Sequence, residues 1–133
     1  MATKSSVLGL IIGVITVLII ASAVGENANS QISKIVTVEE SGFSQSCVET
    51  GCYNPSVLTV KSGSVVTMIN TDETGVHTFT SGTVDGQTPI PNGMFDSQVL
   101  MPGDSYEHKF SQKGTFDYYC TLHTWMNGQI IIE

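Results

Sequence analysis

The feature that most limits the fold of this chain is a succession of short segments rich in β-branched and aromatic residues, each ended by turn-forming residues. Such segments are typical of β-strands, and the glycine, proline and asparagine between them favour turns. No window after the N-terminal segment repeats its apolar residues with the period of a helix. About eight short strands in about a hundred residues predict an all-β fold, an antiparallel β-sandwich with Greek-key connections. The predicted strands cover residues 32–39, 56–60, 64–70, 76–81, 95–101, 105–111, 116–120 and 128–133.

Two connections carry expectations of their own. The tripeptide KSG at 61–63 separates two strand-like segments and predicts a hairpin-like break. Residues 82–94 hold glycines and prolines without alternation, so we expect an irregular loop there, with room for one short helical turn.

The N-terminal segment differs in composition from the rest of the chain. Residues 7–25 form an uncharged apolar run of 19 residues, long enough to cross a bilayer core of about 30 Å as a helix. Lys4 before this run predicts that the N-terminus stays in the cytoplasm and that the following residues cross the membrane. The small residues ASA at 21–23 keep a second interpretation open, a cleavable signal peptide. Both interpretations export the remainder.

We therefore divide the chain into three parts. Residues 1–25 are a membrane anchor in the form of a hydrophobic helix, or a signal peptide; residues 26–31 are a polar tether; and residues 32–133 are one domain. From residue 26 onward there are 12 acidic residues and four lysines, and the chain has no arginine. This balance argues against nucleic acid or an anionic membrane surface as a partner, because both require a basic face.

Export also decides how the three cysteines are interpreted. Cys47 and Cys52 enclose only VETG, a short loop that a disulfide closes easily in an oxidising compartment. That pairing leaves Cys120 without a partner. We predict a Cys47–Cys52 disulfide and a functional Cys120.

The stretch YYCTLHTWM near the C-terminus places three soft donors within seven residues: a thiol on Cys120, an imidazole on His123 and a thioether on Met126. Its flanks are strand-like, so a loop that wraps around an ion explains this spacing better than a helix face. Another ligand must come from a different strand. His77 begins a predicted strand directly after a loop and suits this role, whereas His108 shares a strand face with aromatic residues and is interpreted as structural. Two imidazoles, a thiolate and a weak axial thioether describe a blue-copper centre.

The C-terminal residues KGTFDYYCTLHTWMNGQIIIE (113–133) resemble the ligand-bearing signature of the cupredoxins, the type 1 copper proteins, and are most similar to amicyanin-, halocyanin- and plastocyanin-like members. Residues 70–82 are similar to the segment that carries the first histidine ligand of that family, and residues 95–110 to the strands between. The resemblance implies a cupredoxin-like Greek-key sandwich that binds one copper ion and shuttles single electrons. The copper ligands that it implies are His77, Cys120 and His123, with Met126 axial.

Four neighbours of these ligands depart from the family pattern or shape the site. Thr78 stands where members often have an asparagine that fastens the ligand loop, so that fastening is by a hydroxyl or is absent. Leu122 and Thr124 stand where related short loops often have proline, and the N–H of either residue could donate to the Cys120 sulfur and raise the reduction potential. Trp125 either shields the site or belongs to a hydrophobic docking patch.

Together these observations predict a single-electron carrier rather than an enzyme, on the outer side of a membrane, anchored through residues 7–25 or secreted. Its partners are expected to be redox proteins with a positively charged or hydrophobic docking face. The alternative is a copper enzyme or sensor that acts on a small molecule, such as a nitrogen oxide, at an open axial position. Zinc fits two histidines and a cysteine chemically, but a loop with an axial methionine is not a zinc motif.

Overall fold

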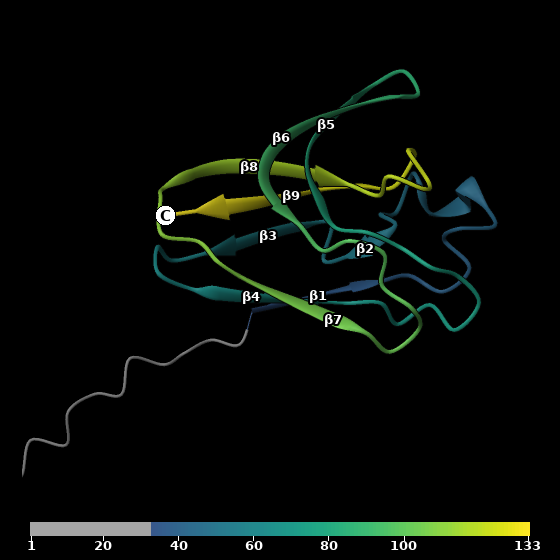
Figure 1. The fold of residues 1–133 in the computed structure, drawn as a ribbon, viewed down its shortest axis with the longest axis horizontal. Helices are drawn as coiled ribbons and strands as arrows, with labels where there is room; N and C mark the ends of the chain where they lie inside the picture. Colours follow the sequence, from purple (N-terminus) through teal and green to yellow (C-terminus); the bar gives the residue numbers. More distant parts are fainter. Residues whose placement is uncertain (1–32) are drawn as a thin grey trace, which may run out of the picture.

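The computed structural model describes residues 33–133, which form two β-sheets packed face to face (Figure 1). The first sheet has the strand order β2-β1-β4-β7 and the second has the order β3-β9-β8-β5-β6. The strands are β1 (Ser33–Thr37), β2 (Tyr53–Asn54), β3 (Val57–Val60), β4 (Val65–Ile69), β5 (Thr80–Asp85), β6 (Thr88–Asp96), β7 (Ser105–Lys109), β8 (Gly114–Tyr119) and β9 (Asn127–Ile132). A single 3-10 turn, η1 (Gln45–Cys47), is the only helical element in the described part of the chain.

Alternation of apolar and polar residues explains why these segments pair as strands. In β1, Ile35 is buried while its neighbour Lys34 is exposed, and in β4 Val66 and Met68 point inward. Because side chains in a strand alternate between faces, each of these strands gives one face to the core. The core between the sheets also holds Phe79, Phe95, Phe110, Phe116, Tyr53, Tyr118, Ile130 and Ile132. The predicted all-β fold is confirmed.

The pairing of the strands differs from the prediction in one respect. The KSG segment does not join a hairpin, because β3 pairs in parallel with β9 and β4 pairs in parallel with β1 in the other sheet. The chain passes from one sheet to the other at this point, so both sheets are mixed rather than purely antiparallel. Sequence patterns identify strands, but they carry little information on which strands become neighbours.

Residues 82–94 are also better ordered than predicted, because they form most of a long hairpin of β5 and β6. The turn lies at Gly86, whose φ of +63° falls in the left-handed region that favours glycine. Most of β6 is exposed, and it is the outer strand of its sheet, where Pro89 and Pro91 are tolerated. An exposed hairpin shows no apolar alternation, which is why the sequence pattern missed it.

The predicted N-terminal helix and the anchor at residues 7–25 lie outside the described residues. Within residues 33–133, no helix is long and apolar enough to cross a membrane. One end of the sandwich gathers four connections that position the site described below (Figure 1). They are residues 38–52, here named the capping segment, residues 70–79, the first-histidine loop, residues 97–104, and residues 120–126, the cysteine loop.

Candidate metal centre

His77 is held in the first-histidine loop by a backbone bridge. Its N–H donates to the carbonyl of Leu100, and its own carbonyl accepts from the Leu100 N–H, at 3.2 and 2.8 Å. The side chain is completely buried. This short bridge fixes the backbone on both sides of the imidazole, so the ring enters the interior in one orientation.

The cysteine loop connects β8 to β9 and closes on itself. The Cys120 N–H donates to the Met126 carbonyl at 3.1 Å, and the Met126 N–H donates to the His123 carbonyl at 2.9 Å. Cys120 and Met126 are fully buried, whereas His123 is partly exposed. These two backbone hydrogen bonds therefore fix the backbone positions of the three residues that carry the thiol, the imidazole and the thioether.

The structure brings three of the four predicted donors, those of His77, Cys120 and His123, together from these two loops. The Cys120 sulfur lies 3.6 Å from Nδ1 of His123 and 4.0 Å from Nδ1 of His77, and the three donor atoms lie within 4.8 Å of one another. Zinc bonds thiolate sulfur at about 2.3 Å and imidazole nitrogen at about 2.0 Å, so one ion of that size can be shared by donors at these separations. The residues present therefore fit a mononuclear metal held by two Nδ1 atoms and one thiolate.

The electrostatics of Cys120 and His123 favour the forms of these two groups that bind metal. Burial alone raises the pKa of the Cys120 thiol, but its hydrogen bond with His77 and the backbone N–H groups of Thr78, Leu122 and His123 outweigh burial and lower that pKa. A lowered thiol pKa favours the thiolate, which is the metal-binding form. Burial and the neighbouring His77 lower the pKa of His123, which keeps that imidazole neutral.

Thr78 fastens the two loops to each other, as one of the two predicted alternatives requires. Its hydroxyl accepts a hydrogen bond from the N–H of Thr121 at 2.9 Å, and its own N–H donates to the Cys120 sulfur at 3.4 Å. The Thr78 hydroxyl is also hydrogen-bonded to the hydroxyl of Thr80. Of the two predicted alternatives, a hydroxyl fastening or none, the structure shows the hydroxyl fastening.

The remaining predicted neighbours take different positions. Leu122 has an exposed side chain, and its backbone N–H is one of the groups that act on the Cys120 sulfur. Thr124 contributes a carbonyl that accepts from Asn127. Trp125 packs its ring 5.3 Å from that of His123 and donates its indole N–H to the carbonyl of Ser41, which favours the shielding role over a docking role. His108 stays among aromatic rings, far along β7 from this end, as the structural interpretation requires.

The capping segment is a part of the site that the sequence did not predict. The predicted Cys47–Cys52 disulfide is present and closes this segment. Gly42 lies against the two imidazoles: a Cβ at this position would be 2.9 Å from Cε1 of His123 and 3.2 Å from Cε1 of His77. Only glycine leaves room for this close approach of the backbone, and nothing in the local sequence SGF distinguishes it from an ordinary turn glycine.

Asp72 is the second residue that the sequence did not single out. Its Oδ2 lies 2.7 Å from Nε2 of His77, and both side chains are fully buried. Burial raises the pKa of this carboxyl, but hydrogen bonds from Thr74 and His77 hold it far below its ordinary value. Against burial, the hydrogen bonds with Cys120 and Asp72 raise the pKa of His77. The segment TDETG reads as a polar loop, and no sequence pattern shows that one of its acids turns inward.

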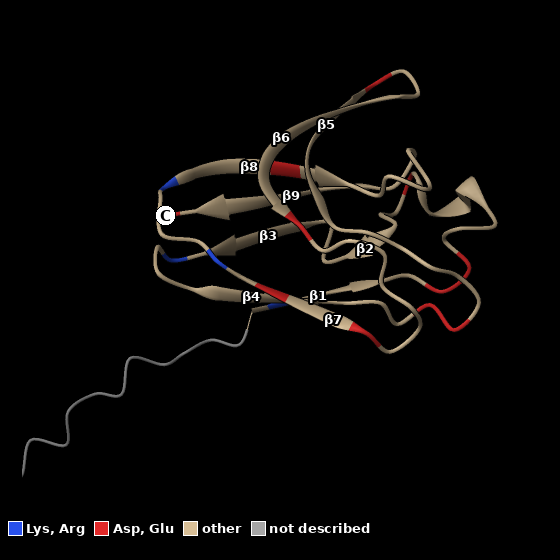
Figure 2. Ribbon diagram, in the orientation of Figure 1, with Lys and Arg blue, Asp and Glu red and all other residues tan. Residues whose placement is uncertain are grey.

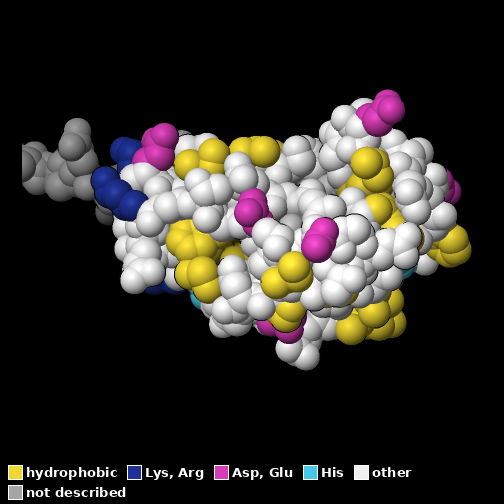
Figure 3. Space-filling model, turned by 90° about the horizontal axis from the view of Figure 1, so that it is seen from above, with side chains coloured by type: hydrophobic (Ala, Val, Ile, Leu, Met, Phe, Trp, Pro, Cys, Tyr) yellow, Lys and Arg dark blue, Asp and Glu magenta, His cyan; other side chains and the backbone are white. Residues whose placement is uncertain are grey.

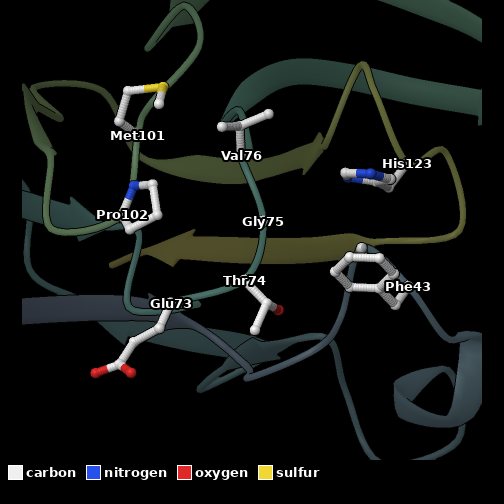
Figure 4. Close-up of a pocket in the computed structure, with 9 residues that line it drawn as sticks. Phe43, Glu73, Thr74, Gly75, Val76, Met101, Pro102 and His123 are labelled. Atoms are coloured by element: carbon white, nitrogen blue, oxygen red, sulfur yellow. The ribbon is translucent and has the colours of Figure 1, made fainter.

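A shallow groove of about 390 Å³ opens beside His123 (Figure 4). Figure 4 shows the His123 ring at one side of it, Phe43 of the capping segment below that ring, and Met101 and Pro102 on the far side. Phe43 is 77% exposed and Met101 56% exposed. The partly exposed imidazole is therefore the donor group through which the buried centre reaches the surface.

Comparisons with known proteins agree with this geometry. Residues 49–133 match the sequence model of the copper-binding proteins of the plastocyanin/azurin family. Amicyanin-alpha from Methylorubrum extorquens is 36% identical over 76 residues, which cover 56% of this chain and 58% of that protein. Amicyanin from Paracoccus denitrificans is 32% identical over 83 residues, which cover 61% of this chain and 58% of that protein. The chain thus spans somewhat more than half the length of these relatives.

A similar solved structure is the one described as a novel purple cupredoxin from Nitrosopumilus maritimus. It superposes with a TM-score of 0.60 at 28% identity, covering 76% of this chain and 99% of that chain. The match extends over almost the whole of that chain. The fold is that of the cupredoxins.

Proposed function

This chain belongs to the plastocyanin/azurin family of copper-binding proteins, and from that membership we propose that it carries single electrons between redox proteins on the outer side of a membrane. The proposed copper ligands are Nδ1 of His77, the thiolate of Cys120 and Nδ1 of His123, with the Met126 thioether axial. Copper, when bound, supplies the one-electron chemistry by alternating between Cu(I) and Cu(II).

The observation that carries this proposal is the donor set held in a closed, mostly buried frame. Sulfur donors favour Cu(I) and imidazoles accommodate Cu(II), so a mixed set serves both states. Cys120 and Met126 are fully buried and joined by a backbone hydrogen bond, and the capping segment covers the two imidazoles. Donor residues held in this way are expected to keep their positions when the metal gains or loses an electron.

The surface around His123 supports docking of a protein partner. Its partly exposed ring adjoins the groove beside the apolar side chains of Phe43 and Met101. Contact there brings a partner within reach of the imidazole edge, which is bonded to the proposed metal. The proposed route for the electron is therefore outer-sphere transfer through His123, with no substrate bound to the ion.

Charge on the domain is distributed unevenly between its ends (Figure 2). Lys61 and Lys113 flank strand ends next to the C-terminus, because the Ser62 N–H donates to the Glu133 carbonyl and Gly114 pairs with Ile132. Acidic side chains follow the loops at the opposite end, including Glu73 in the groove (Figure 2). Seen from above in Figure 3, the lysines are again gathered at one end, whereas apolar side chains are spread along the whole face. A partner with positive charge around an apolar centre suits this surface.

The domain organisation belongs to the same proposal. We propose that residues 1–25 anchor the chain in a membrane or direct its secretion, and that residues 26–31 tether the domain of residues 32–133 outside the cytoplasm. The Cys47–Cys52 disulfide supports an oxidising compartment, since disulfides persist there and are rare in the cytosol.

The alternative, a copper enzyme or sensor for a small molecule, requires an open axial position. The complete burial of Met126 in the cysteine loop weighs against it, because a fully buried side chain at this position of the loop leaves little access for an exogenous ligand. The deciding experiment compares the visible and electron paramagnetic resonance spectra of the Cu(II)-loaded chain with those of Met126→Ala. A changed spectrum in the variant is expected for an axial thioether.

The matched control for this experiment is Met68→Ala. Met68 is also fully buried, but it lies in β4 and pairs with Tyr106 of β7. Both variants create a similar cavity and lose about 2–5 kcal/mol of stability, yet only Met126→Ala is expected to alter the spectrum. An identical spectrum in Met126→Ala would contradict axial ligation and favour the small-molecule enzyme.

A further inference from the structure

His77 has two ring nitrogens that face opposite environments. Nδ1 faces the Cys120 sulfur at 4.0 Å, on the side of the proposed metal. Nε2 faces away from it, 2.7 Å from Oδ2 of Asp72, and both side chains have no exposed surface. Burying a carboxylate away from water costs free energy unless hydrogen bonds compensate for the lost hydration. The hydrogen-bond partners of Asp72 therefore show how its charge is stabilised.

The other oxygen of Asp72 accepts three hydrogen bonds. They come from the N–H of Glu40 in the capping segment at 3.2 Å, the N–H of Thr74 at 3.0 Å and the hydroxyl of Thr74 at 2.6 Å. With the Nε2–H of His77, all four groups around the carboxylate are then donors. Two acceptor oxygens are required, and an amide of the same shape supplies only one.

The backbone leaves space for this pair at Gly75. A Cβ there would lie 2.9 Å from Oδ2 of Asp72 and 3.0 Å from Nε2 of His77, directly at their hydrogen bond. Asn70 holds the same turn in place, because its amide donates to the carbonyls of Gly75 and Leu100 at 2.9 Å each. The contact between Asp72 and His77 is thus built into the loop.

We propose that Asp72 is a positioning residue for the copper centre: it holds the proton of His77 on Nε2, presents the lone pair of Nδ1 to the metal, and through its negative charge favours Cu(II) over Cu(I). The inference deepens the proposed function, because it requires copper on Nδ1 of His77. Carboxylates behind metal-bound histidines fix the tautomer and raise the basicity of the ring, and their loss costs about 10–100-fold in metal affinity. A fixed negative charge stabilises the more positive oxidation state.

The test is Asp72→Asn in the full chain loaded with copper. The Cu(II) affinity is expected to fall about 10–100-fold. Cu(I) affinity should fall less, and each tenfold difference between the two raises the reduction potential by about 59 mV. In the Cu(I) form, proton NMR of the wild type should show an Nε2–H signal of His77 that exchanges slowly with water, and the variant should lose this protection.

Thr37→Val is the matched control. The Thr37 hydroxyl accepts from the N–H groups of Thr71 and Asp72 and donates to Asn70, so its loss loosens the same loop without touching His77. The control is expected to lose stability but to keep the wild-type potential. Gly75→Ala provides a second variant that retains the carboxylate and separates it from Nε2, and its potential should shift in the same direction as that of Asp72→Asn.

The outcomes separate this inference from the proposed function. If the wild type binds copper without a thiolate–copper spectrum, the proposed function fails. If the wild type shows that spectrum but Asp72→Asn and Gly75→Ala both keep its potential, its affinity ratio and the Nε2–H signal, the inference is overturned while the proposed function stands. A shift in Thr37→Val as large as that in Asp72→Asn would also overturn it, since the effect would then be loosening of the loop.

Discussion

His77 and His108 lie at opposite ends of β4 and show how one fold treats the same side chain in two ways. His77 lies beyond the C-terminal end of β4 and has a carboxylate on one nitrogen and a thiol on the other. His108 pairs with Val66 near the start of β4, and its ring packs 5.2 Å from that of Phe95 and 4.7 Å from that of Phe110.

The electrostatic consequences of the two environments are opposite. Hydrogen bonds to Cys120 and Asp72 raise the pKa of His77 against the effect of burial, whereas burial alone lowers the pKa of His108. Burial in an apolar neighbourhood keeps an imidazole neutral and inert, and burial among polar partners orients it for chemistry. The two histidines therefore differ in role because their neighbours differ. The end of the sandwich that holds His77 and the cysteine loop is called the metal end below.

The largest expected effect comes from removing each imidazole in turn. His77→Ala should abolish the strong visible absorption of the copper form. It should also weaken Cu(II) binding more than the loss of a residue that only supports a ligand, which costs about 10–100-fold in affinity. His108→Ala should leave the spectrum and affinity unchanged. Absorption spectra and a copper titration measure both, and an unchanged spectrum in His77→Ala would break the comparison.

The disulfide should stabilise the metal end measurably. Replacing Cys47 and Cys52 together with serine opens a loop of six residues, for which chain entropy gives a loss of about 2 kcal/mol in the free energy of unfolding. Urea unfolding measures this loss. Phe43→Ala, in the same segment but exposed, is the control and should change stability by less than about 0.5 kcal/mol. Equal stability of the double variant and the wild type would mean that the closed loop contributes nothing.

Charge at the metal end should appear in electron-transfer rates. At low salt, a small cationic oxidant should react with the Cu(I) form about tenfold or more faster than an anionic oxidant of similar driving force, and the ratio should shrink as salt is added. Glu73→Gln should reduce the ratio, and Lys113→Gln, at the far end, should change it less. Stopped-flow measurement of both oxidants checks this, and equal rates at low salt would argue against an acidic docking face.

The smallest effect concerns His108 and pH. Because its pKa is lowered in the folded state, the unfolded chain binds more protons just below the ordinary histidine pKa of about 6.5, so stability falls as pH decreases through that window. His108→Phe should flatten this part of the curve and leave stability above pH 7.5 nearly unchanged. Denaturant unfolding at a series of pH values checks it. The same slope in the variant would assign the dependence to other groups.

Sequence reasoning reached the all-β fold class and the cluster of His77, Cys120 and His123 for physical reasons that are local. Alternation marks strands that have one buried face, and the donor types of Cys120, His123 and Met126 are visible within one short loop. His77 was chosen because the predicted strand 76–81 put it at a strand start after a loop; the structure begins β5 only at Thr80 and holds His77 in the loop by its isolated bridge to Leu100. The β5–β6 hairpin was missed because β6 and the second half of β5 are mostly exposed and therefore carry no apolar alternation.

What the sequence could not supply are contacts between distant segments. The parallel pairing of β3 with β9 joins residues that are far apart in the chain, which no local pattern specifies. Gly42 and Asp72 belong to loops that read as ordinary turns, and only the folded chain brings them against His123 and His77. The supporting shell of the site is therefore harder to predict than its donors.

The central claim, one copper ion bonded to the Cys120 thiolate in a one-electron centre, is tested most directly by titrating Cu(II) into the full chain while recording visible absorption, with Cys120→Ser as the comparison. Strong absorption that saturates at one copper per chain, is absent from the variant and bleaches with one electron equivalent is the predicted result. Weak, colourless binding to the wild type, or the same colour in Cys120→Ser, would contradict the claim.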